Sequence, residues 1–283
     1  MMLRAGQYDV YILETGRFRL DAGVVFGVIP KALWGKNVTP DSQNRMKMAL
    51  RSILIIGNDH KILVETGAGR HLNKRLKRLY QIDHSEFSLE KALKQVGISK
   101  DEITDVINTH LHFDHCGGNV VFQEGALSPA FPNAIYHIQK AQLKWAQSPS
   151  ILDKNSYVPE DYMLLLDQNM IRSVEGETEL FPGIHIFTTR GHTPGQQHIL
   201  LKDFQEPLFF CADLFPLHYN IKTTWISSLD IFPLDFIAEK EKFLYRAEQN
   251  AWRIIFPHDK EVISAKVRKS TKYYRAYEKR FDY

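Results

Sequence analysis

The sequence predicts one α/β domain over residues 1–283, and three observations predict it. Glycine-bounded β-type runs alternate with segments whose apolar residues recur every three to four positions. Hydrophobic residues make up 44% of the chain and charged residues 24%, which is typical of a globular protein and excludes a disordered one. Four expected strands lead into loops that carry His or Asp, and such loops carry the site in layered α/β folds. No Pro-, Gly- or Ser-rich linker divides the chain.

The N-terminal part is expected to be β-structure. Residues 8–13 and 17–20 predict two short strands, because glycines bound them. Residues 50–56 and 61–65 flank the turn-forming sequence Gly57-Asn58-Asp59, which predicts a β-hairpin.

Helical periodicity begins in the middle of the chain. Leucine and valine recur at i, i+4 and i+7 between Ser88, a suitable N-cap, and Gly97, a stop signal. Residues 105–108 then predict a buried strand, and a strand over 134–138 is followed by a helix over 139–146.

The second half also combines expected strands with a helix. Strands are expected over 184–188, 198–201 and 208–211. A helix is expected over 235–252, because its large apolar side chains lie near one face. The short run 253–256 predicts a final strand.

The strongest chemical signal is the run from His110 to His115, in which four of six side chains are of metal-binding types. An extended loop can aim His110 and His112 at one ion, and Asp114 and His115 can turn to a second. Imidazole and carboxylate suit zinc, and also iron or manganese. Burying so many polar groups together requires compensation, which a cation supplies. Gly117-Gly118 allows a tight turn afterwards.

A lone histidine is more often a surface or core residue than a ligand. We assign seven of the 12 histidines to that class by default: His60, His71, His84, His137, His185, His198 and His218.

The run His-x-His-x-Asp-His-x-Gly-Gly resembles the signature of the metallo-β-lactamase superfamily. Three later motifs follow in that family's order: Gly191-His192-Thr193-Pro194-Gly195, Cys211-Ala212-Asp213 and Phe256-Pro257-His258. Residues 62–67 are similar to its early strand, with Glu65 where an Asp is common. The resemblance extends from about residue 50 to about residue 260. It implies an αβ/βα sandwich of two mixed β-sheets, with helices on the outer faces and the site at one edge.

The resemblance also implies a dinuclear site in which no ligand position is missing. The expected cofactors are two Zn²⁺ ions, with iron or manganese as alternatives. The implied ligands are His110, His112 and His192 for the first metal, Asp114, His115 and His258 for the second, and Asp213 for both.

Such a site predicts a metal-dependent hydrolase for a small ester, lactone or phosphotriester. Two cations about 3.5–4 Å apart can activate a water molecule for attack on a carbonyl or phosphoryl centre. Asp114 and Asp213 are candidates to carry a proton to the leaving group. Cys116 and Cys211 lie beside ligands, and we interpret them as packing residues.

Within the superfamily, residues 110–119 and 20–34 resemble the quorum-quenching lactonases and the methyl-parathion-hydrolase-like enzymes. Phe26, Trp34 and Trp225 could line an apolar pocket or fill the core. The lactonases often carry a Tyr, which assists the substrate carbonyl, where this chain has Pro216. His218 or Tyr219 could take that role, and both are pocket candidates.

Three other functions are compatible with the same fold. A nuclease of the same fold would use the basic stretches 70–78 and 266–280, with tyrosines of the second stacking on bases. A solvated helix face is the alternative interpretation of residues 266–280, and a net charge of only +3 favours it, so no nucleic-acid partner is expected. Relatives that oxidise persulfides bind a single iron with fewer protein ligands, so the full set of seven ligand positions disfavours that activity. A non-enzymatic interaction module of the same fold would be expected to have lost metal ligands, whereas this sequence keeps all seven ligand positions.

The composition also predicts the compartment. No run approaches the roughly 18 apolar residues of a membrane span, and residues 1–23 lack the apolar run of a signal peptide. Two cysteines do not make a disulfide framework. We therefore expect a cytoplasmic enzyme with a small-molecule substrate and no membrane partner. The oligomeric state is open, and a homodimer is one option.

Overall fold

The computed structural model describes residues 2–5, 7–57, 59–202 and 206–281, and the chain divides into two compact units. Unit 1 comprises residues 1–17 and 50–176, and unit 2 comprises residues 18–49 and 177–283. The chain passes between the units inside two long strands, β2 (Tyr8–Asp21) and β3 (Arg45–Gly57), and again between residues 176 and 177. The expectation of a single domain over 1–283 stays a prediction.

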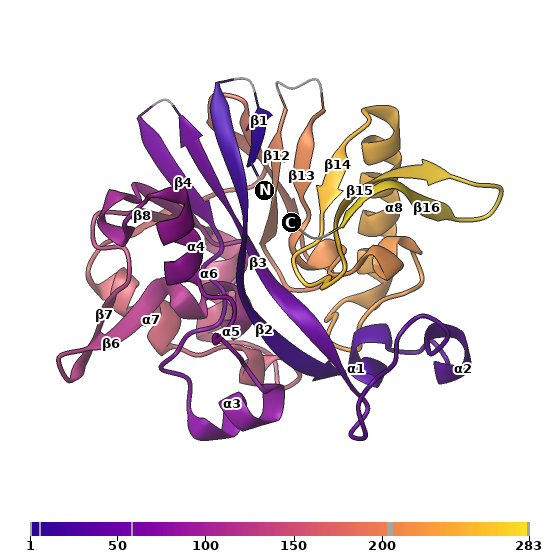
Figure 1. Ribbon diagram of the computed structural model, residues 1–283, viewed down its shortest axis with the longest axis horizontal. Helices are drawn as coiled ribbons and strands as arrows, with labels where there is room; N and C mark the ends of the chain where they lie inside the picture. The colour runs from indigo at the N-terminus through magenta and orange to yellow at the C-terminus, as the bar shows by residue number, and fades with distance from the viewer. Residues whose placement is uncertain (1, 6, 58, 203–205, 282–283) are drawn as a thin grey trace. The chain divides into compact units, whose positions relative to one another are not determined.

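The first sheet has seven strands in the order β1-β2-β3-β4-β5-β8-β9 (Figure 1). Its other strands are β1 (Met2–Ala5), β4 (His60–Val64), β5 (Asp105–Ile107), β8 (Ile135–Gln139) and β9 (Ile171–Val174). Strands β4, β5, β8 and β9 are parallel neighbours, whereas β3 and β4 are antiparallel, so the sheet is mixed. Every residue of β5 is buried, as expected of an inner parallel strand.

The described part of unit 1 also contains five α-helices and a small hairpin. They are α3 (Lys74–Tyr80), α4 (Leu89–Val96), α5 (Phe113–Cys116), α6 (Lys140–Gln147), α7 (Glu160–Asp167), β6 (Val120–Gln123) and β7 (Ala126–Pro129). Helix α4 has the predicted caps, since Ser88 Oγ accepts from Lys91 N and Gly97 adopts a left-handed conformation. Its Leu93 packs with Leu63 and Val106 of the sheet.

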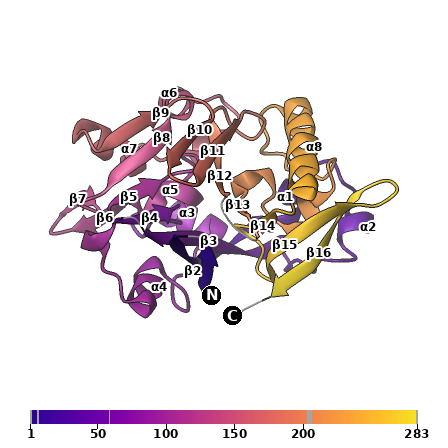
Figure 2. The same ribbon diagram turned by 90° about the horizontal axis from the view of Figure 1, so that it is seen from above.

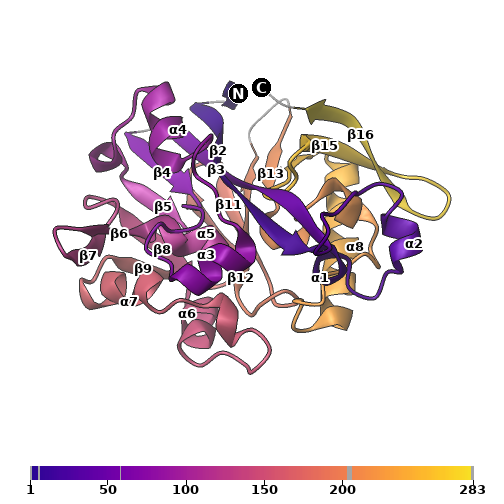
Figure 3. The same cartoon turned by 60° about the horizontal axis from the view of Figure 1, so that its bottom comes forward.

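The second sheet also has seven strands and is mixed, because only β13 and β14 are parallel. The strands are β10 (Thr178–Phe181), β11 (Ile184–Thr189), β12 (Gln196–Leu201), β13 (Leu208–Phe210), β14 (Arg253–Ile255), β15 (Val262–Lys269) and β16 (Tyr274–Phe281). Helix α8 (Pro233–Gln249) covers one face of this sheet, where Phe243 packs with Phe209 and Trp252 (Figure 2). The short helices α1 (Ala22–Phe26) and α2 (Lys31–Trp34) are clearest in Figure 3.

The structure corrects two local expectations. Residues 8–13 and 17–20 belong to one strand, β2, and Gly16 lies within it. A Cβ at Gly16 would approach His84 Nδ1 to 2.8 Å, so glycine gives room to a neighbour and does not end the strand. The stretch 266–280 is not a helix but most of the antiparallel hairpin β15–β16.

The remaining expected elements are present with ends shifted by a few residues. Helix α8 begins two residues early, because Pro233 suits the first turn of a helix. The expected hairpin is β3–β4, and its turn residue Asn58 lies outside the described residues. Among the described residues, every helix is too short or too polar to cross a bilayer.

Candidate metal centre

The ligand run of unit 1 follows the buried strand β5. His112 is the N-cap of the one-turn helix α5, which carries Asp114 and His115. The side chain of His115 is fully buried, whereas that of Asp114 is 15% exposed. A Cβ at Gly117 would lie 2.4 Å from Gly69 N, and one at Gly118 would lie 2.3 Å from Thr66 O. The two glycines are therefore needed because the ligand run packs directly on the segment that follows β4.

The donor atoms of unit 1 converge in the two predicted pairs. His110 Nε2 lies 3.0 Å from His112 Nδ1, so these nitrogens point at a common position. His115 Nε2 lies 3.7 Å from Asp114 Oδ2. Donor atoms of Glu65, His110 and His115 also lie within 4.8 Å of one another.

Glu65 and Thr109 orient two histidine rings of this run through contacts with Nδ1. Glu65 Oε1 accepts from His115 Nδ1 at 2.8 Å and also from Thr109 Oγ1. The Thr109 hydroxyl contacts His110 Nδ1 at 3.0 Å. A hydrogen bond on Nδ1 fixes the tautomer that presents Nε2 to a metal. Thr109 had no sequence signal beyond its place before His110, and Glu65 was noted only for standing where an Asp is common.

Unit 2 supplies a carboxylate with a histidine at each oxygen. Asp213 lies on a 3₁₀ turn (Ala212–Leu214) directly after β13. Its Oδ1 is 3.1 Å from His258 Nε2, and its Oδ2 is 3.4 Å from His192 Nε2. This is the arrangement expected of a carboxylate that bridges two metals with different histidine ligands.

Both histidines of unit 2 are held through Nδ1. His192 Nδ1 contacts Asp230 Oδ1 at 2.8 Å, and His258 Nδ1 donates to Ala49 O at 2.9 Å. Burial raises the pKa of Asp230, and the hydrogen bond to His192 opposes that rise. Sequence reasoning missed Asp230, because 38 residues separate it from His192 and no motif surrounds it.

The donor set fits divalent metal ions. Four of its five histidines have Nδ1 on a protein oxygen, and in each of these Nε2 is left to act as the ligand atom. His112 instead presents Nδ1. Imidazoles whose second nitrogen is bonded to a carboxylate, hydroxyl or carbonyl are the usual pattern at zinc sites.

The residues beside the ligands are structural, as expected of the cysteines. Cys116 is fully buried, and burial raises the pKa of its thiol well above the ordinary value. Cys211 is buried as well, and its thiol donates to Ile255 O and Phe215 O. His198 contacts Thr189 Oγ1 and Cys211 O, both at 2.9 Å.

Acid is expected to weaken the fold through His198. Burial lowers the pKa of His198 from 6.5 to about 3. Between these values the unfolded chain binds a proton that the folded chain does not. The free energy of unfolding should therefore fall as the pH drops below 6.5, by up to about 1.4 kcal/mol per pH unit. Urea unfolding at pH 7 and pH 5 measures this fall. His198→Gln should reduce it and His185→Gln, on the neighbouring strand, should not; an unchanged slope in the first variant would contradict the assignment.

The predicted pocket residues all lie in unit 2, and four of them form one aromatic cluster. Phe26 stacks on Trp34 with ring centroids 5.3 Å apart and meets Trp225 edge-on at 5.5 Å. The ring of Tyr219 also packs against the ring of Phe26, with centroids 6.3 Å apart. Tyr219 also lines a cavity of about 340 Å³, together with Met46 and Asp259. His218 Nδ1 contacts Asp259 Oδ2 at 2.5 Å.

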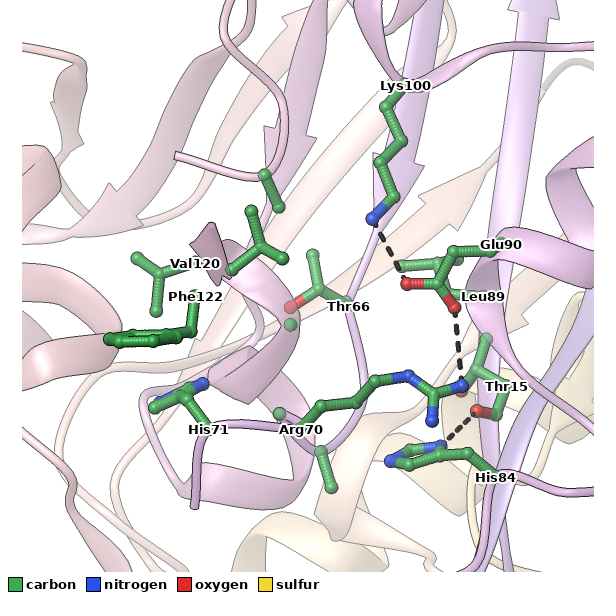
Figure 4. A pocket seen from close by; sticks show the side chains of 15 residues that line it. Thr15, Thr66, Arg70, His71, His84, Leu89, Glu90, Lys100, Val120 and Phe122 are labelled. Atoms are coloured by element: carbon green, nitrogen blue, oxygen red, sulfur yellow. Dashed lines mark hydrogen bonds and ion pairs between the residues drawn. The ribbon is translucent and has the colours of Figure 1, made fainter. Parts of the chain in front are cut away.

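A second cavity, of about 230 Å³, lies in unit 1, and its lining includes Thr66, Arg70 and Glu90 (Figure 4). Thr66 and Gly118 form part of its wall, and Thr66 N donates to His115 O at 2.9 Å. Its one carboxylate, Glu90, contacts Lys100 at 3.1 Å and Arg70 at 3.8 Å, so it offsets only one of these two positive charges. None of the residues that the sequence nominated for the site lines it.

Comparison with known proteins identifies the family. The family model of the metallo-beta-lactamase superfamily matches residues 51–258. The N-acyl homoserine lactonase of Bacillus cereus is 34% identical over 202 residues, which are 68% of this chain and 70% of that protein. A crystal structure described as a probable metal-dependent hydrolase from Staphylococcus aureus is 25% identical, with a TM-score of 0.86 over 98% of this chain and 99% of the other.

A further solved structure has the same fold. The dizinc quorum-quenching lactonase AidC, in complex with the product N-hexanoyl-L-homoserine, has a TM-score of 0.82 over 100% of this chain and 98% of its own, at 22% identity. The chain thus belongs to the metallo-beta-lactamase superfamily, as its motifs predicted. It is a metal-dependent hydrolase with the metallo-beta-lactamase fold of mixed sheets and helices.

Proposed function

We propose that this protein is a dinuclear zinc lactonase that opens N-acyl homoserine lactones or chemically similar small lactones. The single observation that carries the proposal is the Asp213 carboxylate with a histidine Nε2 at each oxygen. The 34% identity to the Bacillus cereus lactonase supports the substrate class. AidC, which is dizinc, supports the choice of metal.

The proposal assigns the ligands of both units to one centre, because the family match runs through both. His110, His112 and His192 would hold one ion, Asp114, His115 and His258 the other, and Asp213 both. When bound, two divalent cations supply an activated water and polarise the substrate carbonyl.

The residues of the chain then have distinct tasks. Glu65 and Asp230 keep His115 and His192 in the tautomer that binds metal. Asp114 is the better candidate for carrying a proton to the leaving alkoxide, because each oxygen of Asp213 already faces a histidine. Phe26, Trp34 and Trp225 are buried, so these pocket candidates fill the core of unit 2 and are not assigned to the substrate.

His218 is the candidate for the role that a Tyr has in related lactonases. Asp259 Oδ2 accepts from His218 N at 2.9 Å and also contacts Nδ1, so the ring is held in one orientation with Nε2 as its other polar atom. Pro216, which stands at the tyrosine position, contributes only its carbonyl, to His258 N at 3.1 Å. The Tyr219 hydroxyl is committed to Asn37 O.

Replacing His218 is expected to slow lactone opening about 10-fold or more, within the range for one general acid or hydrogen-bond donor. His218→Ala and Tyr219→Phe should be compared by kcat and KM on one lactone, with zinc content measured for both. The account expects a fall in kcat in the first variant alone, at unchanged zinc content. An equal loss in both variants, or none in His218→Ala, would overturn this role.

A substrate panel tests the proposed function. Zinc-loaded protein is assayed with an N-acyl homoserine lactone, a simple γ-lactone, an aryl ester and an aryl phosphotriester, each with and without chelator. The proposal expects the homoserine lactone to be the best substrate and chelator to abolish its hydrolysis. A clear preference for the phosphotriester or ester would contradict it.

No observation favours the nuclease alternative. In the hairpin β15–β16, Lys266 and Arg280 contact the Glu206 carboxylate at 3.1 and 2.9 Å. Arg253 contacts the same carboxylate at 2.7 Å. Part of the basic stretch is thus neutralised within the unit, which weakens it as a phosphate-binding surface. Homodimer formation and a cytoplasmic location stay predictions.

A further inference from the structure

Helix α8 carries two adjacent charged side chains that the proposed chemistry does not use. Lys240 is fully buried, with an exposed fraction of 0%, and Glu239 is half-buried. Burying an ammonium group is costly unless it is well bonded. The contacts of this pair therefore indicate what the helix holds in place.

Lys240 is bonded to one turn of the chain. Its Nζ donates to Trp225 O at 2.7 Å and to Lys222 O at 3.1 Å. Trp225 N also donates to Lys222 O, which closes the turn. The ring of Phe236 lies 5.6 Å from the ammonium group, on one side of it. Burial lowers the pKa of Lys240 to about 7, and the charge of Asp230 opposes this.

The turn at 222–225 leads to the partner of His192. Ser227 N donates to Asp230 Oδ2 at 2.7 Å, which fixes one oxygen of that carboxylate. The other oxygen contacts His192 Nδ1 at 2.8 Å. Lys240 thus anchors the segment that delivers Asp230 to the histidine.

Glu239 binds the segment that leads to His192. Its two oxygens accept from Arg190 N at 2.8 Å and from Gly191 N at 3.0 Å, immediately before His192. A Cβ at Gly191 would lie 2.4 Å from Phe236 Cα, so the loop is pressed against α8. One turn of α8 therefore holds both segments that meet in the His192–Asp230 pair.

We propose that Glu239 and Lys240 are positioning residues, which fix the His192–Asp230 pair and thereby the direction of His192 Nε2. This inference rests on the proposed function, because it takes His192 as a metal ligand. Partners that orient a ligating histidine typically change metal affinity or activity about 10- to 100-fold when removed. A loosened 222–230 segment should act in the same way as loss of Asp230 itself.

The first test is Lys240→Met in the full-length protein. Zinc affinity is measured by competition with a chromophoric chelator, beside kcat, KM and the thermal unfolding midpoint of the zinc-free protein. We expect zinc affinity and kcat to fall about 10-fold or more, with little change in KM. The matched control is Lys242→Met on the same helix, whose side chain is 59% exposed, and it should behave as wild type.

A double-mutant cycle separates positioning from general destabilisation. If Lys240 acts through Asp230, Lys240→Met combined with Asp230→Asn should bind zinc no more weakly than Asp230→Asn alone. Effects that multiply would overturn the proposal. Should Lys240→Met fail to fold, Glu239→Gln is expected to lose zinc affinity several-fold, and combined with His192→Ala it should bind zinc no more weakly than His192→Ala alone.

His192→Ala distinguishes failure of the inference from failure of the proposed function. If this variant keeps the full zinc content of the wild type, His192 is not a ligand and the proposed function itself is wrong. If it loses zinc while Lys240→Met and Glu239→Gln bind zinc as wild type does, only the positioning role is wrong.

Discussion

Replacing Asp213 by alanine is expected to lower kcat/KM for the best lactone by more than about 100-fold and to remove at least one bound metal ion. The loss should exceed the 10- to 100-fold typical of a residue that only orients a ligand, because we propose that Asp213 itself binds both ions. Its two oxygens lie 3.1 and 3.4 Å from Nε2 of His258 and His192. Without the carboxylate, neither ion keeps its full ligand set.

The measurement pairs steady-state kinetics with metal analysis of the same sample. Glu241→Ala, which removes an exposed carboxylate from α8, is the control and should keep both activity and metal. Full activity in Asp213→Ala would rule out the two-metal mechanism. A variant that loses activity but keeps two metals would reassign Asp213 to a purely chemical role.

Replacing Glu65 by glutamine is expected to weaken zinc binding about 10- to 100-fold. The side chain is 97% buried and accepts from both His115 Nδ1 and Thr109 Oγ1. Glutamine keeps the size but removes the negative charge that makes His115 a more basic ligand. Because Thr109 also orients His110, the change reaches one histidine of each predicted metal pair.

Chelator competition on Glu65→Gln and on the control Glu86→Gln measures this effect. Glu86 is exposed and its variant should bind zinc as wild type does. A Glu65→Gln protein with wild-type affinity would show that the carboxylate serves folding alone. Zinc-free unfolding midpoints of both variants identify any general loss of stability.

Most of the candidate site could be predicted from the sequence because its proposed ligands lie in short local motifs. His110 to His115 lie within six residues, and the other ligands lie in motifs that follow the apolar strands β11, β13 and β14. Strand periodicity locates these ends, since a fully buried strand is a short apolar run bounded by loops. The ligand spacing and the strand ends therefore predict the same site independently.

The side chains that support the ligands could not be predicted, because nothing local marks them. Asp230 reaches His192 across 38 residues, and Glu239 reaches Gly191 across 48. Lys240 has the sequence of an exposed helix residue, flanked by Glu239 and Glu241, yet it is fully buried. The segment between the 3₁₀ turn at residues 218–221 and helix α8 brings the carbonyls of Lys222 and Trp225 to the Lys240 ammonium group only when the chain is folded.

The basic hairpin shows a different limit of sequence reasoning. Residues 266–280 contain seven Lys or Arg, and this charge suggested a solvated helix face and not a strand. Val267 and Tyr274 are nevertheless buried and pack into the core of unit 2. Charged side chains along the outermost strand are a common way to protect a sheet edge from pairing with other chains.

The central claim is that one chain holds two metal ions, and its most direct test is metal stoichiometry. The protein is loaded with zinc, freed of excess by gel filtration, and analysed for zinc and protein by mass spectrometry, before and after chelation. The account predicts about two zinc ions per chain and loss of lactone hydrolysis as they are removed. One ion or fewer per chain at saturating zinc, in a protein that still opens lactones, would contradict it.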